Sequence, residues 1–257
     1  MKSLFLDKSL GMDIREDSIG LILLGKKLRI AETLAGDFIK LKPLTGQDEK
    51  AEKHFLNEVN RFLIDNNSWP DSVVVSLPRS LIMFKTFELP APDEKTVRSM
   101  IDFELERHFS SGLENLYYTY QTNQKPGNIF HVAASAIKKE IADYYLELIH
   151  KLNLKPTVLN ISTFANASLL TPHESKEPVV SALADISSKS LDIVLIKNGI
   201  IEFSRSLSWK FFEQNNVFFE KDTFPENIEK LSKPISKKIV EALEQSLSSC
   251  SKIEDNE

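Results

Sequence analysis

Two aspartates stand at matching places in two similar stretches of this chain. Asp13 lies in "GMDIREDSIGLILL" and Asp185 lies in "LADISSKSLDIVLI". In each stretch an apolar run ends at the aspartate and a polar turn follows. Phosphate-binding turns have this outline, and they use glycine for close backbone approach and backbone N–H groups directed at the anion. The pattern therefore raises the question of whether these turns hold a nucleotide.

The residues inside the first turn do not suit a phosphate. Arg15, Glu16 and Asp17 follow shortly after Asp13. The two carboxylates of Glu16 and Asp17 would repel a phosphate at close range. The alternative interpretation is that Asp13 and Asp185 cap their turns through bonds from side chain to backbone.

No other set of side chains predicts catalysis or metal binding. The histidines are scattered, and none is paired at ligand spacing; they are His54, His108, His131, His150 and His173. The segment "ELERHF" (104–109) contains acids, a base and a histidine, but helical spacing puts them on different faces. We expect a solvated helix face there, with Phe103 and Phe109 directed to the core. The sequence thus predicts no catalytic residue and no metal site.

Composition and charge argue against some classes of function. The chain has 257 residues, a formal net charge of -5 and 42% hydrophobic residues. An acidic chain without a dense Lys/Arg block is a poor candidate for nucleic-acid binding. The single cysteine, Cys250, cannot form an intrachain disulfide, which favours a reducing compartment. No run of about 18 apolar residues occurs, so we expect any membrane span to lie beyond Glu257.

Hydrophobic periodicity predicts alternating strands and helices. Residues 9–40 read as a meander of three strands with a turn at Gly25–Lys27, and residues 178–208 read as a second meander with Asn198-Gly199 as a hairpin turn. Helices are expected over 47–66, 93–109, 138–152 and 225–249. Asp93 is a candidate N-cap. Further strands are expected near 72–78, 81–92, 116–123, 128–137 and 154–162, and a Phe-rich connector spans 209–224.

In their order and spacing, these segments resemble the PilM/GspL family of actin-like assembly proteins of type IV pili and type II secretion systems. The most specific parts are "ELPAPDEKTVRSMIDFELERHF" and "KKEIADYYLELIHKLNLKPTVLNISTFANA", within a match from about residue 9 to 209. The resemblance implies an α/β fold of the actin-like (ribonuclease H-like) type with two lobes. The first lobe would cover 1–78, a small αβ insert 79–135, and a truncated second lobe, lacking the adenosine-loop region, 136–257.

The resemblance also bears on nucleotide binding. The family's first loop has a glycine where this chain has Arg15, and a lysine where it has Gly20. In the second loop, Ser187 replaces glycine and Leu191 replaces threonine, although Ser188 and Ser190 keep hydroxyls. Asp13 and Asp185 are therefore interpreted as vestigial phosphate-loop positions. No cofactor is expected, and the chain is not expected to be an enzyme.

The function that the resemblance implies is a scaffold on the cytoplasmic side of the bacterial inner membrane. A GspL-like platform component would dock the secretion ATPase. The alternatives are a PilM-like pilus adaptor and an actin-like ATPase whose nucleotide state switches partner binding. Expected partners are the secretion or pilus assembly ATPase, inner-membrane platform proteins and a second copy of the chain as a homodimer, with no nucleic acid. The sequence leaves type II secretion and type IV pili as open alternatives.

Overall fold

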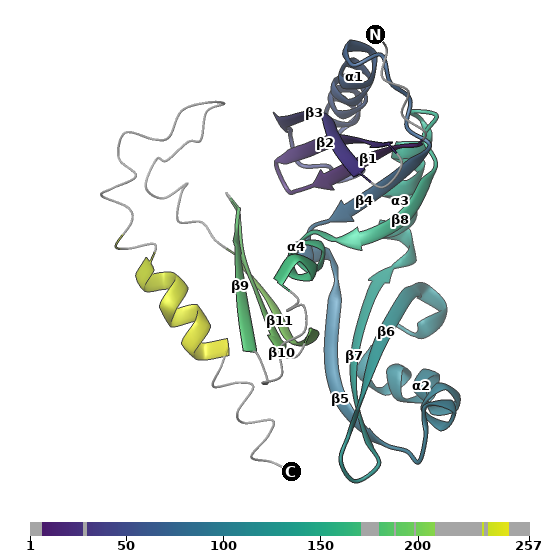
Figure 1. The fold of residues 1–257 in the computed structure, drawn as a ribbon, viewed down its shortest axis with the longest axis vertical. Helices are drawn as coiled ribbons and strands as arrows, with labels where there is room; N and C mark the ends of the chain where they lie inside the picture. Colours follow the sequence, from purple (N-terminus) through teal and green to yellow (C-terminus); the bar gives the residue numbers. More distant parts are fainter. Residues whose placement is uncertain are drawn as a thin grey trace. The chain divides into compact units, whose positions relative to one another are not determined.

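The computed structural model describes residues 7–27, 30–170, 180–187, 189–197, 199–208, 233 and 236–246 (Figure 1). The chain divides into two compact units. One consists of Met1–Pro78 and Glu140–Ala165, and the other of Arg79–Lys139 and Asn166–Glu257. Among the described residues, no helix is both long enough and apolar enough to cross a bilayer.

The first unit is built on a five-stranded sheet in the order β3-β2-β1-β4-β8. Its strands are β1 (Asp7–Ile14), β2 (Ser18–Lys27), β3 (Ile30–Lys40), β4 (Ser72–Leu77) and β8 (Pro156–Ile161). The first three form the predicted antiparallel meander, while β4 runs parallel to β1 and β8 parallel to β4. Strand β2 continues through Gly25–Lys27, and Lys27 pairs with Ile30, so the predicted turn position is too early.

Two amphipathic helices complete this unit, α1 (Glu49–Asp65) and α3 (Lys139–His150). Helix α1 begins after Asp48, whose side chain accepts hydrogen bonds from the backbone N–H groups of Lys50 and Ala51. Such an N-cap satisfies donors that have no partner inside the helix. The predicted apolar face of α1 is buried, as it contains Ala51, Phe55, Val59, Phe62 and Leu63.

The insert forms the start of the second unit. Its elements are η1 (Arg79–Leu81), β5 (Met83–Pro90), α2 (Glu94–His108), η2 (Leu113–Asn115), β6 (Leu116–Lys125) and β7 (Ile129–Lys138). The antiparallel sheet has the order β5-β7-β6. As predicted, Asp93 caps α2, accepting a 2.7 Å hydrogen bond from the Thr96 backbone N–H.

The core of the insert corrects one predicted orientation. Val97, Ile101 and Leu105 of α2 are buried with residues of β5 and β7, and Phe109 joins them. Phe103, however, is 68% exposed. The buried residues recur every four positions and so mark one helix face, and Phe103 lies two positions from both Ile101 and Leu105 on the opposite face.

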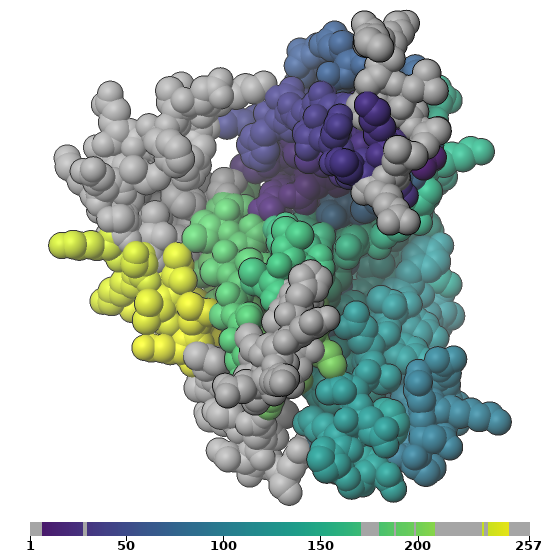
Figure 2. Space-filling view, in the orientation of Figure 1, coloured from purple at the N-terminus to yellow at the C-terminus, as the bar shows by residue number. Residues whose placement is uncertain are grey.

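The second predicted meander is also present, as β9 (Val180–Ile186), β10 (Ser190–Lys197) and β11 (Ile200–Ser208) in the order β11-β10-β9. The central strand β10 is buried along almost its whole length. Residues 236–246 are helical and pack Ala242 against Leu191, Ile193 and Leu195, and Figure 2 shows this helix in yellow against the green strands. Asn198, the connector 209–224 and the rest of the helix predicted over 225–249, apart from residue 233, lie outside the described residues.

The two units do not follow the domain boundaries expected from sequence. Residues 140–165, which were assigned to the second lobe starting at 136, belong to the first unit. The physical reason is the pairing of β8 with β4, in which Val75 lies beside Leu159. A parallel pair requires a long crossover connection, and here the whole insert lies within that connection.

Candidate functional site

The first of the two predicted phosphate-loop turns joins β1 and β2. Asp13 is the penultimate residue of β1 and pairs directly with Gly20 of β2. The turn is closed by a 2.9 Å hydrogen bond from the Arg15 backbone N–H to the Ser18 carbonyl oxygen. Because β1 alternates buried and half-buried residues, Asp13 falls on the face opposite Met12 and Ile14.

Both carboxylate oxygens of Asp13 have side-chain partners. Arg15 Nε donates to Oδ2 at 2.8 Å, and the Ser162 hydroxyl donates to Oδ1. The Arg15 side chain is only 20% exposed, which is low for an arginine in a turn. The guanidinium neutralises Asp13 from within the turn. A positive charge that a phosphate would need is thus already engaged by the chain's own carboxylate.

Ser162 connects this turn to two other segments of the first unit. It is the first residue of α4 (Ser162–Ala167) and is 5% exposed. Its hydroxyl lies 3.1 Å from the Leu77 carbonyl oxygen at the end of β4, in addition to its bond with Asp13. A hydroxyl has one proton to donate, so the two acceptors share it. This contact fixes the start of α4 against the ends of β1 and β4.

The second turn, between β9 and β10, is closed by a serine. Ser187 Oγ accepts from the backbone N–H groups of Ser190 at 2.8 Å and Lys189 at 3.2 Å. The Ser187 N–H in turn donates to the Ser190 carbonyl oxygen at 2.9 Å. An anion-binding turn needs N–H groups that point at the ligand. Here a hydroxyl of the chain receives two of them.

Asp185, the second predicted phosphate-loop position, bonds to a side chain. Asn166 Nδ2 donates to its carboxylate at 3.1 Å. Asp13 and Asp185 belong to different units of the chain. Each aspartate thus accepts hydrogen bonds from neighbouring side chains, and in the second turn Ser187 acts as the cap.

The other candidate residues are spread over the molecule. Glu104 forms an exposed ion pair with Arg107, and the His108 ring stacks on Phe87 with centroids 4.2 Å apart. Burial lowers the pKa of His108 from its usual value. Across the described part of the chain, no group of three or more His, Cys, Asp or Glu side chains is close enough to hold a metal ion.

A buried polar cluster in the second unit was missed by sequence reasoning. Arg79 is 6% exposed, and its guanidinium donates to the Ser204 hydroxyl at 2.6 Å, to the Ser204 carbonyl at 2.9 Å and to the Ile82 carbonyl. Burial lowers the pKa of Arg79 to about 10, and the charge of Asp192 partly opposes this. The one sequence signal is that Arg79 stands between two apolar runs, VVVSLP and SLIMF.

A second polar contact, between His131 and Glu202, also links the insert to β11. His131 Nε2 of β7 lies 3.0 Å from Glu202 Oε2 of β11. His131 is 6% exposed. Together with Arg79 it joins the insert sheet to β11 by polar contacts, which were not predictable because the partners are far apart in the sequence.

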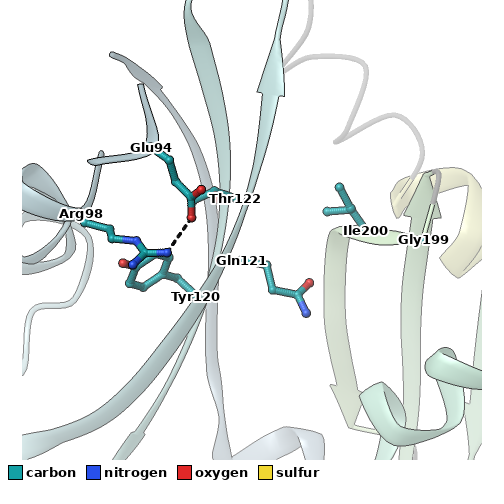
Figure 3. Close-up of a pocket in the computed structure, with 7 residues that line it drawn as sticks. All are labelled: Glu94, Arg98, Tyr120, Gln121, Thr122, Gly199 and Ile200. Carbon is teal, nitrogen blue, oxygen red and sulfur yellow. Dashed lines mark hydrogen bonds and ion pairs between the residues drawn. The ribbon is translucent and has the colours of Figure 1, made fainter. Parts of the chain in front are cut away.

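An open groove of about 630 Å³ lies beside the middle of β6 (Figure 3). Helix α2 contributes one wall, where Arg98 Nη2 and Glu94 Oε1 are 2.9 Å apart. Ile200, the first residue of β11, and Gly199 before it form another wall. The lining residues are Glu94, Arg98, Tyr120, Gln121, Thr122, Gly199 and Ile200.

Comparison with models of known protein families and with curated protein sequences gives no match. Solved structures do match. A PilM–PilN type IV pilus biogenesis complex aligns with a TM-score of 0.68 at 17% identity, covering 95% of this chain and 74% of the other. The chain has the fold of the PilM/GspL family.

A second solved structure is also similar to this chain. The cytoplasmic domain of EpsL, an inner-membrane component of the type II secretion system of Vibrio cholerae, aligns with a TM-score of 0.52 at 12% identity, covering 84% of this chain and 79% of the other. The predicted actin-like α/β fold is therefore confirmed. In this PilM/GspL-type fold, each of the two meanders carries one of the turns described above.

Proposed function

We propose that this chain is a non-catalytic adaptor of a bacterial pilus or secretion assembly platform, located on the cytoplasmic side of the inner membrane. It would act by binding other proteins of the platform. The observation that carries the proposal is the ion pair of Arg15 with Asp13, which fills the first phosphate-loop turn with the chain's own groups.

The second turn supports the same proposal. The hydroxyl of Ser187 takes up the N–H groups of Lys189 and Ser190. A nucleotide would have to displace both arrangements and would meet the carboxylates of Glu16 and Asp17. The cost of breaking these bonds and the like-charge repulsion both oppose binding.

The solved structures that share the fold support the class of partner. The PilM chain of the solved complex is bound to PilN, and EpsL is an inner-membrane component of its secretion system. We propose a membrane-anchored platform protein as one partner and the assembly ATPase as another. The net charge of -5 favours partners with basic surfaces.

Nucleotide binding is tested by calorimetry and thermal unfolding with MgATP. A ligand present at 100 times its dissociation constant would stabilise the protein by about 2.7 kcal/mol. We expect no shift in melting temperature at millimolar MgATP. A dissociation constant below about 100 μM, which corresponds to roughly -5.5 kcal/mol, would contradict the proposal.

Partner binding is tested by co-purification with the assembly ATPase and the platform proteins encoded in the same genome. The adaptor role predicts a complex with at least one of them, formed equally well with and without MgATP. Absence of every such complex, with turnover of a nucleotide by the isolated chain, would reject it.

The second candidate function is a nucleotide-dependent switch. Its support is that Asp13 and Asp185 both remain at the strand ends where this fold places phosphate loops. The Asp13→Asn variant separates the two. A switch would lose nucleotide-dependent partner binding in this variant, whereas an adaptor would bind its partners as the wild type does.

A further inference from the structure

Strand β6 forms an edge of the insert sheet. In the described part of the chain it pairs with β7 alone, from Leu116 opposite Lys138 to Lys125 opposite Ile129. In an antiparallel pair, alternate residues direct their backbone N–H and C=O groups away from the partner strand. The outer side of β6 therefore presents a row of donors and acceptors that a further strand can pair with.

The edge of β6 lacks the features that prevent such pairing. It is ten residues long, contains no proline, and its pairing with β7 shows no register shift. Its only charged residue is Lys125 at the end, and that ammonium is bonded to Glu88. Natural proteins usually protect edge strands with charges, prolines, bulges or short length.

Most other edges of the described sheets carry this protection. Strand β3 contains Glu32, Asp37 and Lys40, and its pairing has a register shift. Strand β8 has six residues and begins at Pro156, and β11 has a register shift and two charges. Strand β5 contacts β11. Strand β9 has no register shift but is shorter than β6 and carries Asp185.

The space beside β6 is open. The groove of about 630 Å³ is lined by residues 120–122, and Figure 3 shows Gln121 extending on the side of Ile200, away from Tyr120. Thr119 and Gln121 are exposed. The walls add no net charge, because Glu94 and Arg98 form an ion pair with one another.

We propose that two copies of this chain pair through their β6 edges in antiparallel orientation, which joins two insert sheets into one continuous sheet of six strands. A two-fold axis perpendicular to the sheet makes the edge complementary to itself. In a register centred on Gln121, Lys125 lies opposite Tyr117 of the second copy, so no like charges meet. Tyr120 then lies opposite Thr122 of the second copy, and aromatic and β-branched residues pair favourably across strands.

The interface is small, because it rests on one strand and its flanks. Interfaces that bury less than about 1,200 Å² are typical of weak complexes. We expect a dissociation constant on the order of 10 to 100 μM, within reach of the local concentration on a multi-copy platform. The inference concerns self-association and stands independently of the adaptor role.

Sedimentation velocity over about 1 to 300 μM protein spans this expected value. Wild type should change from monomer to dimer across the range. Thr119→Lys and Gln121→Lys place a charge on the edge and should each weaken the dimer at least about tenfold. Thr33→Lys makes the same change on β3, another exposed edge strand, and should dimerise as the wild type does.

Two further measurements make the outcome decisive. Melting temperatures of the three variants identify any that fail to fold, and hydrogen exchange compares β6 amides in concentrated and dilute wild type. Slower exchange in β6 at high concentration supports the pairing. A monomer at every concentration overturns it. So does a dimer that Thr119→Lys and Thr33→Lys affect equally, or one in which β6 exchange does not depend on concentration.

Discussion

Arg79 holds a positive charge inside the second unit. Its guanidinium bonds to Ser204 and Ile82, and Asp192 lies close enough for its charge to affect the pKa of Arg79. A buried charge is tolerated only with such partners, because removal from water is costly. The arrangement ties η1, at the start of the insert, to β11.

Replacing Arg79 by methionine keeps much of the volume and removes the charge. We expect Arg79→Met to lower the free energy of unfolding by about 3 to 5 kcal/mol, because the Ser204 groups and the Ile82 carbonyl lose their donor and the Asp192 carboxylate loses a nearby positive charge. Urea denaturation measures this. Arg98→Met is the matched control. Arg98 is exposed and paired only with Glu94 on the surface, so its loss should cost at most about 1 kcal/mol. Equal effects of the two variants would contradict the role given to Arg79.

His108 provides a prediction on pH. Its pKa is lowered by burial against Phe87, so the folded state binds a proton less readily than the unfolded state. The contribution of His108 to the free energy of unfolding is therefore fully present above pH 6.5, the approximate pKa of histidine in the unfolded chain. It decreases as the pH falls from about 6.5 towards the lower pKa of the folded state. The effect should stay below about 1 kcal/mol, since the ring is partly solvated. Urea denaturation from pH 7.5 to 5 should show a smaller decrease in His108→Gln than in wild type; equal decreases would contradict the assignment.

At the scale of elements, the cap of α2 is a local feature that the sequence predicts well. Asp93 accepts from the backbone N–H and the hydroxyl of Thr96. These bonds lower the pKa of Asp93. Removing an N-cap aspartate typically costs about 1 kcal/mol.

The Asp93→Ala variant tests that contribution. We expect its free energy of unfolding to fall by about 1 kcal/mol, with the loss concentrated in the insert. Asp65→Ala removes an exposed aspartate from the last turn of α1, where a negative charge opposes the helix dipole, and should be neutral or slightly stabilising. Thermal unfolding compares the two. A neutral Asp93→Ala would show that α2 is held by its core contacts alone.

Local sequence patterns predict most of the elements. They do not predict which strands pair when the partners are far apart in the sequence. The two meanders, the buried face of α1 and the cap of α2 follow from periodicity and from residue type. The assignment of β8 to the first unit does not, because six residues of strand sequence carry no record of which sheet they join. Residue type alone predicts a buried Phe103, but its position relative to Ile101 and Leu105 puts it on the exposed face of α2.

The candidate site shows the same limit. The sequence shows that glycine is missing at Arg15 and Ser187. It does not show that Arg15 binds Asp13, because that depends on the turn geometry. It also does not show that Ser162, far along the chain, reaches the same carboxylate. The turns are therefore predictable from sequence, but the groups that occupy them are not.

For the whole molecule, the division into two units makes the first one discontinuous. Its sheet needs residues from both sides of the insert. A chain that ends after Lys139 retains β4 but lacks α3 and β8. We expect it to lose cooperative unfolding of the first unit, because Val73 and Val75 lose their strand neighbour.

A chain that ends after Leu170 is the control. It keeps β8 and lacks the same second meander, so the comparison isolates α3, β8 and α4. Hydrogen exchange of β4 amides should be slow in this control and fast in the shorter chain. Slow exchange in both would show that β4 is stable without β8.

This discontinuity also affects the order in which the first unit can fold during synthesis. The meander and β4 leave the ribosome early, but the strand that completes their sheet follows only after the insert. Roughly 80 residues separate β4 from β8, which at about 5 to 20 residues per second is a delay of about 4 to 16 s. During that interval the open side of β4 is exposed to other nascent chains. The insert can fold first, because β6 and β7 form a hairpin and β5, which pairs with β7, has already been synthesised. The insert is then already folded when β8 pairs with β4. Nascent copies of this protein should therefore depend on chaperones chiefly until Ile161 has emerged.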